Sequence, residues 1–229
     1  AAAQPRQRDQ SRAGAGLSLR RRGRSEAWGG AIAGGGSLIK TGAGALSLNG
    51  ANSFGGGLDL QAGTLNVGTD TALGSGALAV NGAATLNAGA AVNLGNAINL
   101  NAALNLGGAN NLGLNGAIAG AGGLSFNGPA TLSLGGSNSF GGGVNLGGGS
   151  LSVGANTALG SGALNVGGNA NLNASAPGIA LGNAVNLGSG VTLGINGGND
   201  LSLGGGIGGA GGLAMSGTGA LNLGGRQQL

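Results

Sequence analysis

Side chains that could perform catalysis are scarce in this sequence. The chain of 229 residues contains no His, Cys or Tyr, and its five carboxylates lie far apart. A serine nucleophile needs a base such as histidine, and zinc sites are built from His or Cys ligands. We therefore expect no catalytic residue, no cofactor-binding residue and no metal ligand, and we do not expect an enzyme.

Three aspartates remain as candidates for acid–base chemistry after position 30, namely Asp59, Asp70 and Asp200. Asp59 and Asp70 could lie near each other on adjacent turns of a repeating fold, as the carboxylate pair of a glycosidase does. Such sites usually also offer aromatic or polar contacts to the sugar, and Tyr is absent. A polysaccharide lyase or hydrolase is therefore one interpretation of these residues, ranked third among the functions considered. We expect instead that the three aspartates are outward, solvated charges.

Three short motifs resemble functional signatures but are too weak to assign. "GGGIGG" at Gly204–Gly209 fits the dinucleotide pattern, yet no acidic partner follows some 20 residues on. "TDT" at Thr69–Thr71 has the form of a water-ordering Thr array, but "ANT" replaces it at Ala155–Thr157. The Arg-rich "LRRRGR" at Leu19–Arg24 could bind nucleic acid, and we favour a disordered, solvated arm.

The net charge of +4 originates in the N-terminal segment 1–30. This segment holds seven Arg, Asp9 and Glu26, whereas residues 31–225 hold only Lys40 and three Asp. The bulk of the chain therefore offers no electrostatic footprint for nucleic acid. Polar residues interrupt every apolar stretch before it reaches the length of a membrane span. Because the first residue is Ala, we expect a processed or truncated chain.

The sequence repeats itself at a distance of 86 to 89 residues. "NSFGGG" at Asn52–Gly57 recurs at Asn138–Gly143, and "TALGSGAL" at Thr71–Leu78 recurs at Thr157–Leu164. Such self-similarity indicates a repeat architecture. We divide the chain into a disordered Arg-rich leader (1–28), a β-helix (29–225) and a tail (226–229). The β-helix consists of two long repeats, about 37–123 and 124–212, and the start of a third, 213–225.

A shorter period of about 20 residues, within the range typical of solenoids, lies inside the long repeat. Apolar–small–apolar triplets, most with a polar middle residue, begin at Leu104, Leu124, Val144 and Leu164, and others fall between them. This alternation is typical of half-buried strands, and strands of three residues are stable only when coils stack. The alternative is a disordered or silk-like Gly-rich chain, but such a chain repeats only a few residues and would not keep its apolar positions in phase over 20 residues. We predict an all-β fold: a single-stranded, parallel, right-handed β-helix with about three strands per coil and about ten coils.

The alternation also predicts which side chains face the core. The two apolar residues of each triplet should point inward, and the polar middle residue, such as Asn105 in "LNL", should point outward. Gly should fill the corners where φ is positive, and Asn is the other residue that tolerates such corners. Phe54 and Phe140 precede "GGG" in each copy, and we expect them to pack at a corner.

The segment Leu38–Gly68 resembles the autotransporter-associated β-strand repeat, also called the passenger-associated transport repeat. The second copy, Leu124–Gly154, departs from the pattern at its start, where Phe126 and Asn127 replace Ile39 and Lys40. A third start at Leu213 is cut short. The residues of the first copy that match the pattern are Lys40, Thr41, Gly42, Gly44, Leu46, Leu48, Asn52, Phe54, Gly55, Gly56, Gly63, Leu65 and Val67.

This resemblance implies a passenger segment of a Gram-negative type V secretion system. Such passengers cross the outer membrane unfolded and form a β-helix at the cell surface, anchored through the outer membrane. The implied partner is a C-terminal β-barrel translocator, which this segment lacks. The implied role is a non-enzymatic stalk or scaffold. We expect no cofactor, no nucleic-acid partner and no transmembrane span.

Two further interactions remain open from the sequence. An adhesin segment is the alternative function, in which outward Asn and Ser side chains bind host or matrix glycans. The near absence of aromatic residues argues against stacking on sugars. Because the last strand ends near Leu223, we also expect exposed Leu221 and Leu223 and end-to-end self-association through a bare strand edge.

Overall fold

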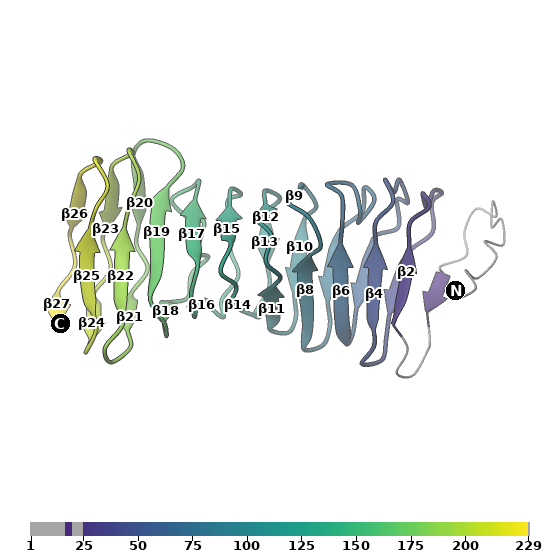
Figure 1. The fold of residues 1–229 in the computed structure, drawn as a ribbon, viewed down its shortest axis with the longest axis horizontal. Coiled ribbons are helices and arrows are strands. Elements are labelled where there is room, and N and C mark those ends of the chain that lie inside the picture. Colours follow the sequence, from purple (N-terminus) through teal and green to yellow (C-terminus); the bar gives the residue numbers. More distant parts are fainter. Residues whose placement is uncertain (1–16, 20–24, 229) are drawn as a thin grey trace.

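The computed structural model describes residues 17–19 and 25–228, and every regular element in this part of the chain is a β-strand (Figure 1). The strands are mostly three to five residues long and stack along one axis into a rod. All pairings are parallel, as between Leu58 and Leu78 or between Leu104 and Leu124. Equivalent residues of successive coils are about 20 residues apart, as expected for a solenoid. The predicted all-β parallel solenoid is therefore confirmed.

One side of the rod, which we call the second side, carries an unbroken 11-stranded sheet with one strand per coil. In sheet order its strands are β2 (Glu26–Trp28), β4 (Ala45–Leu48), β6 (Gly63–Val67), β8 (Ala84–Ala88), β11 (Leu104–Gly107), β14 (Leu124–Phe126), β16 (Val144–Leu146), β18 (Leu164–Val166), β21 (Val185–Leu187), β24 (Ile207–Gly209) and β27 (Gln227–Gln228).

The first side, which precedes the second within a coil, carries a 6-stranded sheet and, further along, a 3-stranded sheet. The first of these contains β1 (Leu17–Leu19), β3 (Leu38–Lys40), β5 (Leu58–Leu60), β7 (Leu78–Val80), β10 (Ile98–Leu100) and β13 (Ile118–Ala119). The other contains β20 (Ile179–Leu181), β23 (Leu201–Leu203) and β26 (Leu221–Leu223).

The third side carries a 7-stranded sheet. Its strands in chain order are β9 (Val92–Leu94), β12 (Leu112–Leu114), β15 (Thr131–Leu134), β17 (Ser150–Val153), β19 (Ala170–Ala174), β22 (Thr192–Ile195) and β25 (Gly212–Met215).

Apolar residues of the three sides fill one continuous core. In β16, Val144 and Leu146 are buried while Asn145 is exposed, and β10 and β21 show the same alternation. Leu104 is fully buried. Fully burying a side chain of this size stabilises the folded state by about 1.5–3 kcal/mol. The predicted division into inward apolar and outward polar residues is confirmed.

Loops replace the strands of one side in some coils, so these coils do not contain the predicted three strands. Residues 49–57 and 68–77 form such loops on the third side, where Ser75 N donates to Phe54 O. Residues 135–143 and 154–163 form their counterparts on the first side, where Ser161 N donates to Phe140 O. These loops separate the two sheets of the first side.

The long sequence repeat therefore advances by one side of the rod. Leu38 begins a strand of the first side, whereas its counterpart Leu124 begins a strand of the second side. A repeat of 86 residues contains four coils of about 20 residues and about six further residues. Six residues are enough to carry the chain from one side of the rod to the next, so the second repeat starts one side later. Identical sequence motifs consequently face different directions.

The solenoid begins earlier than the predicted boundary at residue 29. Strand β1 pairs with β3 in the register Leu17 to Leu38, and β2 pairs with β4 in the register Glu26 to Leu46. Short alternating segments of the predicted leader thus join the stack. Residues 1–16 and 20–24, the rest of that leader, lie outside the described residues.

Candidate functional surface

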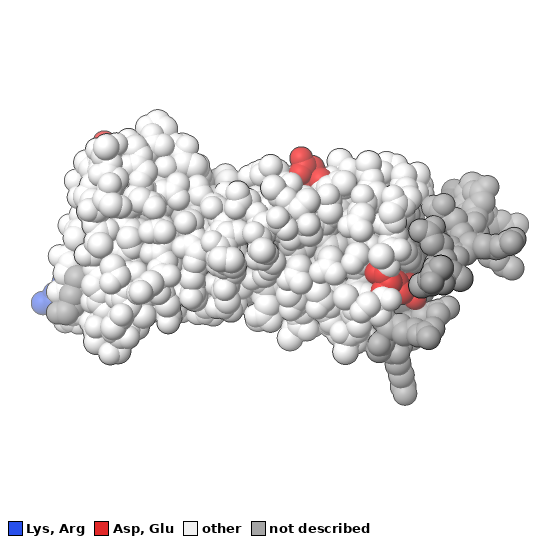
Figure 2. All heavy atoms as spheres, in the orientation of Figure 1, with Lys and Arg blue, Asp and Glu red and all other residues white. Residues whose placement is uncertain are grey.

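The structure does not bring the candidate aspartates together. Asp59 belongs to β5 on the first side, whereas Asp70 lies in the loop of residues 68–77 on the third side. Acidic atoms occupy separate places on the visible face, and most of that face is uncharged (Figure 2). Among the described residues, no group of three or more His, Cys, Asp or Glu side chains could hold a metal ion.

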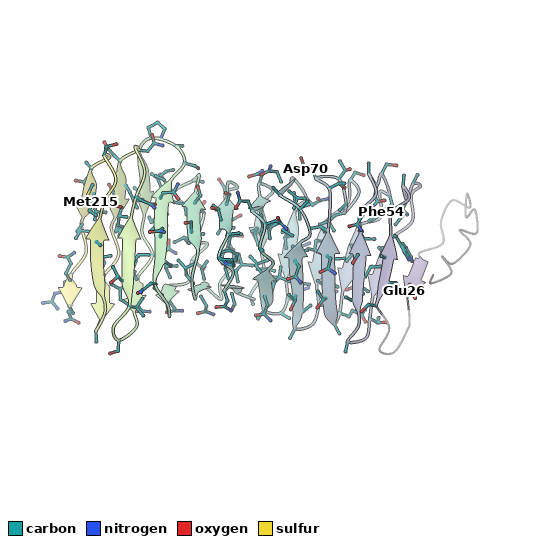
Figure 3. The ribbon with its side chains drawn as sticks, viewed as in Figure 1. Glu26, Phe54, Asp70 and Met215 are labelled. Atoms are coloured by element: carbon teal, nitrogen blue, oxygen red, sulfur yellow. The ribbon has the colours of Figure 1, made fainter. Side chains whose placement is uncertain are left out.

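Each of these aspartates instead accepts hydrogen bonds from a neighbouring coil. Asp70, at the outer edge of the rod in Figure 3, accepts from Asn93 N at 2.8 Å, and Asp200 accepts from Ala220 N at 2.7 Å. Asn156, which lies 86 residues after Asp70, accepts from Ala180 N at 2.9 Å. Because an uncharged amide serves equally well at that position, these contacts stack coils and do not require a carboxylate.

Lys40 is the one charged side chain that the described core contains. It is only 4% exposed, and its Nζ donates to Thr41 O at 3.1 Å, Gly42 O at 2.7 Å and Ala62 O at 3.0 Å. Burial lowers the pKa of the Lys40 ammonium from 10.5, because desolvation disfavours the charged form. The ammonium thus joins the main chains of two successive coils.

The counterpart of Lys40 in the second repeat is Phe126, which corrects the alignment made from the sequence. Both are the last, inward-facing residues of their strands, β3 and β14. A side chain added at Gly63 would meet Lys40 Nζ, and one added at Gly149, 86 residues on, would meet Phe126. One repeat closes this corner with an ammonium and the other with an aromatic ring.

Outward amides and hydroxyls form ladders along the rod. On the second side, Asn186 Nδ2 donates to Asn165 Oδ1 at 2.8 Å, Asn165 to Asn145 at 3.0 Å, and Asn145 to Ser125 Oγ at 3.2 Å. In each such pair the later coil donates to the earlier one. The other ladders start at an acceptor in the same way: Ser47–Asn66–Asn87, Asp59–Asn81–Asn101, Ser152–Asn173 and Ser202–Asn222.

Each amide within a ladder keeps part of its hydrogen-bonding capacity for solvent. An Asn amide has two N–H donors and an oxygen with two lone pairs, and a ladder uses one donor and one lone pair. The second side therefore presents a row of free N–H groups and lone pairs at the strand spacing of about 4.8 Å. This row is the largest regular polar feature that the outward strands position.

A second set of asparagines lies inside the stack. Asn52 Oδ1 accepts from Ile32 N at 2.8 Å and its Nδ2 donates to Ala72 O at 2.6 Å, so it spans three successive coils. Asn96 Nδ2 donates to Gly74 O at 3.0 Å and Gly76 O at 2.8 Å. Both residues are buried. We call this pair the first clamp.

The second clamp consists of Asn138 and Asn183. Asn138 accepts from Ile118 N at 2.8 Å and donates to Ala158 O at 2.7 Å. Asn183 donates to Gly160 O at 3.0 Å and Gly162 O at 2.7 Å. These bonds reproduce those of the first clamp, 86 and 87 residues on, but on the first side of the rod instead of the third.

The buried clamps correct the expectation that Asn occupies corners with positive φ. Among the described residues, positive φ occurs at Gly alone. The Asn of "NSFGGG" instead turns inward because its amide can satisfy main-chain groups of two other coils. Sequence reasoning missed this role. The signal that could have found it was the recurrence of "NSF" and "GNA" in both repeats.

Phe54 and Phe140 are buried, as the sequence predicted. Each packs on a glycine of the next coil, Gly74 or Gly160, with φ of 65° and 64° respectively. A Cβ at either glycine would collide with the carbonyl oxygen of the phenylalanine. Both the left-handed φ and the close approach of the main chains therefore require glycine there.

Comparison with known proteins identifies the repeat. The family model of the passenger-associated transport repeat matches residues 38–67 and 120–153. No curated protein and no solved structure matches the chain. No helix that is long and apolar enough to cross a membrane occurs in the described part of the chain. The resemblance noted in the sequence is thus confirmed: the chain is a β-solenoid, two segments of which match the passenger-associated transport repeat.

Proposed function

We propose that this chain is a non-enzymatic, surface-exposed passenger segment of a type V secretion autotransporter, which acts as a β-solenoid stalk. The observation that carries the proposal is the occurrence of two passenger repeats in one uninterrupted parallel stack. The partner is a β-barrel translocator in the outer membrane, and the location is the bacterial cell surface.

The proposed mechanism is physical. In a solenoid each coil contacts only its neighbours, so every coil that folds adds a roughly constant increment of stability. A chain that emerges unfolded from the outer membrane gains this increment coil by coil outside the cell. Stacking thereby favours outward movement and leaves a rod that holds further domains away from the surface.

The separation of the acidic groups supports a role without catalysis. Asp59, Asp70 and Asp200 accept hydrogen bonds from neighbouring coils. The Lys40 ammonium donates to three main-chain carbonyls. Paired carboxylates of a glycosidase lie within about 5–10 Å of each other. Asp59 and Asp70 lie on different sides of the rod.

A surface-display experiment tests this proposal. The chain is fused to a β-barrel translocator in a Gram-negative host, and exposure is measured by protease accessibility on intact cells. We expect efficient display of the unmodified chain, a several-fold loss with Leu104→Asp and no loss with the outward control Asn105→Asp. Equal display of both variants would contradict a role of stacking in secretion, and absence of display of the unmodified chain would contradict the passenger function.

Adhesion is a second candidate function, favoured by the ladder of Ser125, Asn145, Asn165 and Asn186. Its free donors and acceptors match the hydroxyl groups of an uncharged glycan. Binding of the purified chain to a glycan array tests this function. Saturable binding that is lost in the triple Asn→Ala variant at 145, 165 and 186 would place adhesion above the scaffold role, and absence of binding would remove it.

A further inference from the structure

A solenoid of similar coils faces an ambiguity in its own folding. Leu58, Leu78 and Ile98 occupy the same position in successive coils of the first side. A stack that omits one coil would pair Leu58 with Ile98, so the coils that remain would still place apolar residues opposite one another, although the omitted coil would leave the core. Apolar ladders exclude a slip by one residue, which would turn the apolar side chains outward, but their pairing does not distinguish a shift by a whole coil, which keeps the same residues on the same face.

We propose that the two buried asparagine clamps fix the register of coil stacking. The acceptors of the second clamp all fall on one coil: Ala158 O accepts from Asn138, and Gly160 O and Gly162 O accept from Asn183. A stack that loops out residues 145–164 removes all three acceptors. Both amides then remain buried without these partners, which is strongly unfavourable.

The clamps have the properties that register selection requires. Asn138 is 5% exposed and Asn183 is 8% exposed, so water cannot replace their lost partners. In the described structure no buried side-chain N or O atom lacks a hydrogen bond, so the native register satisfies both. A single buried Asn selects register in the same way in coiled coils, where it also lowers stability.

The outward ladders cannot select the register in this way. Asn145 and Asn186 are exposed, and a ladder amide that loses its neighbour bonds to water instead. Lys40 belongs with the first clamp, because its acceptor Ala62 O lies in the coil that also supplies Ala72 O. The second clamp has Phe126 in place of Lys40 and therefore isolates the effect of the amides.

Disulfide trapping during refolding tests the proposal, because the chain contains no Cys of its own. Residues 125 and 145 are native neighbours, as are 145 and 165. Strands one step apart lie about 4.8 Å from each other, within disulfide range, whereas two steps give about 9.6 Å. The Cys pair 125/145 thus reports the native stack, and the pair 125/165 reports a stack that omits one coil.

With both clamps intact we expect the 125/145 cross-link and no 125/165 cross-link after refolding. In the double variant Asn138→Leu/Asn183→Leu, the fraction of chains that form the 125/165 cross-link should rise at least several-fold. The matched control is Asn81→Leu/Asn101→Leu, which removes two exposed amides that bond to each other in neighbouring coils. A double variant that forms the 125/145 cross-link alone would show that the clamps do not select the register.

A pair of coil deletions decides the matter if the double variant does not fold. Deletion of residues 145–164 removes the acceptors of the second clamp, whereas deletion of residues 98–117 removes an equally long coil between the two clamps and keeps Ile118, the donor to Asn138. We expect the 145–164 deletion to lower the melting temperature clearly more than the 98–117 deletion. An equal decrease would overturn the proposal, because nearest-neighbour stacking alone predicts equal losses.

Discussion

Lys40 is the only Lys of this protein, and His, Cys and Tyr are absent. Its buried ammonium is therefore the only amine among the side chains of this sequence, and burial lowers its pKa from 10.5. The sequence did not identify this charge as buried, because Leu38 and Ile39 are both apolar and the strand therefore shows no alternation that would assign Lys40 to a face. The placement becomes clear only when the corner brings three carbonyl oxygens around Nζ.

We expect stability to increase as the pH rises toward 10.5. The folded protein releases the Lys40 proton at a lower pH than the unfolded chain, because burial lowers the pKa in the fold. Between the two pKa values the unfolded chain binds more protons, so the free energy of unfolding increases with pH. Urea denaturation across this range measures the slope. Lys40→Met should abolish it, and an unchanged slope in that variant would contradict the assignment.

The buried Asn52 should matter more for stability than the outward Asn66. Asn52→Ala leaves Ile32 N and Ala72 O without their partner inside the stack, which costs about 1–3 kcal/mol for each unsatisfied group. Asn66→Ala leaves groups that water can reach, and surface changes of this kind remain within about 0.5 kcal/mol. Chemical denaturation of the two variants checks the difference, which would be absent if both asparagines were merely outward.

At the scale of the strand, period-two alternation was sufficient to predict burial. The triplet of β11 shows why: Leu104 and Leu106 are buried while Asn105 is exposed. The number of strands per coil was harder to predict. Loops such as residues 68–77 also contain buried apolar residues, Ala72 and Leu73, but they follow no alternation.

Opposite outcomes are expected for the same substitution at adjacent positions of β11. Leu104→Asp would place an unpaired carboxylate in the core, which costs several kcal/mol. Asn105→Asp changes an exposed residue and should remain within about 0.5 kcal/mol. Melting temperatures of the two variants test this, and equal shifts would mean that the inward and outward faces of the strand are assigned wrongly.

At the scale of the whole molecule, the sequence predicts the stack but not the direction in which each motif faces. The spacing of the coils follows directly from the positions of Leu104, Leu124 and Val144. The rotation of the long repeat by one side depends on how six extra residues are divided between strands and corners. That division is set by packing between coils, which a single sequence does not display.

The last described coil should mediate concentration-dependent association of the purified chain. Met215, near the C-terminal end of the rod in Figure 3, is 50% exposed. Leu223 in β26 is 41% exposed, whereas Leu221 is partly buried, less exposed than expected. Uncovered strand edges beside apolar side chains promote pairing with another chain. Met215→Lys/Leu223→Lys should reduce the light scattering of concentrated samples, and unchanged scattering would exclude this end as the contact.

A distance measurement along the second side tests the stacked solenoid most directly. Thr64 and Asn186 are outward residues of β6 and β21, six strands apart in the 11-stranded sheet. With a strand spacing of about 4.8 Å, spin labels at these positions should give one narrow distance of about 29 Å, before allowance for the label linkers. A flexible chain of this separation would give a broad distribution centred at about 60 Å. Pulsed electron paramagnetic resonance of Thr64→Cys/Asn186→Cys distinguishes the two, and the broad distribution would contradict the parallel stack on which the scaffold function rests.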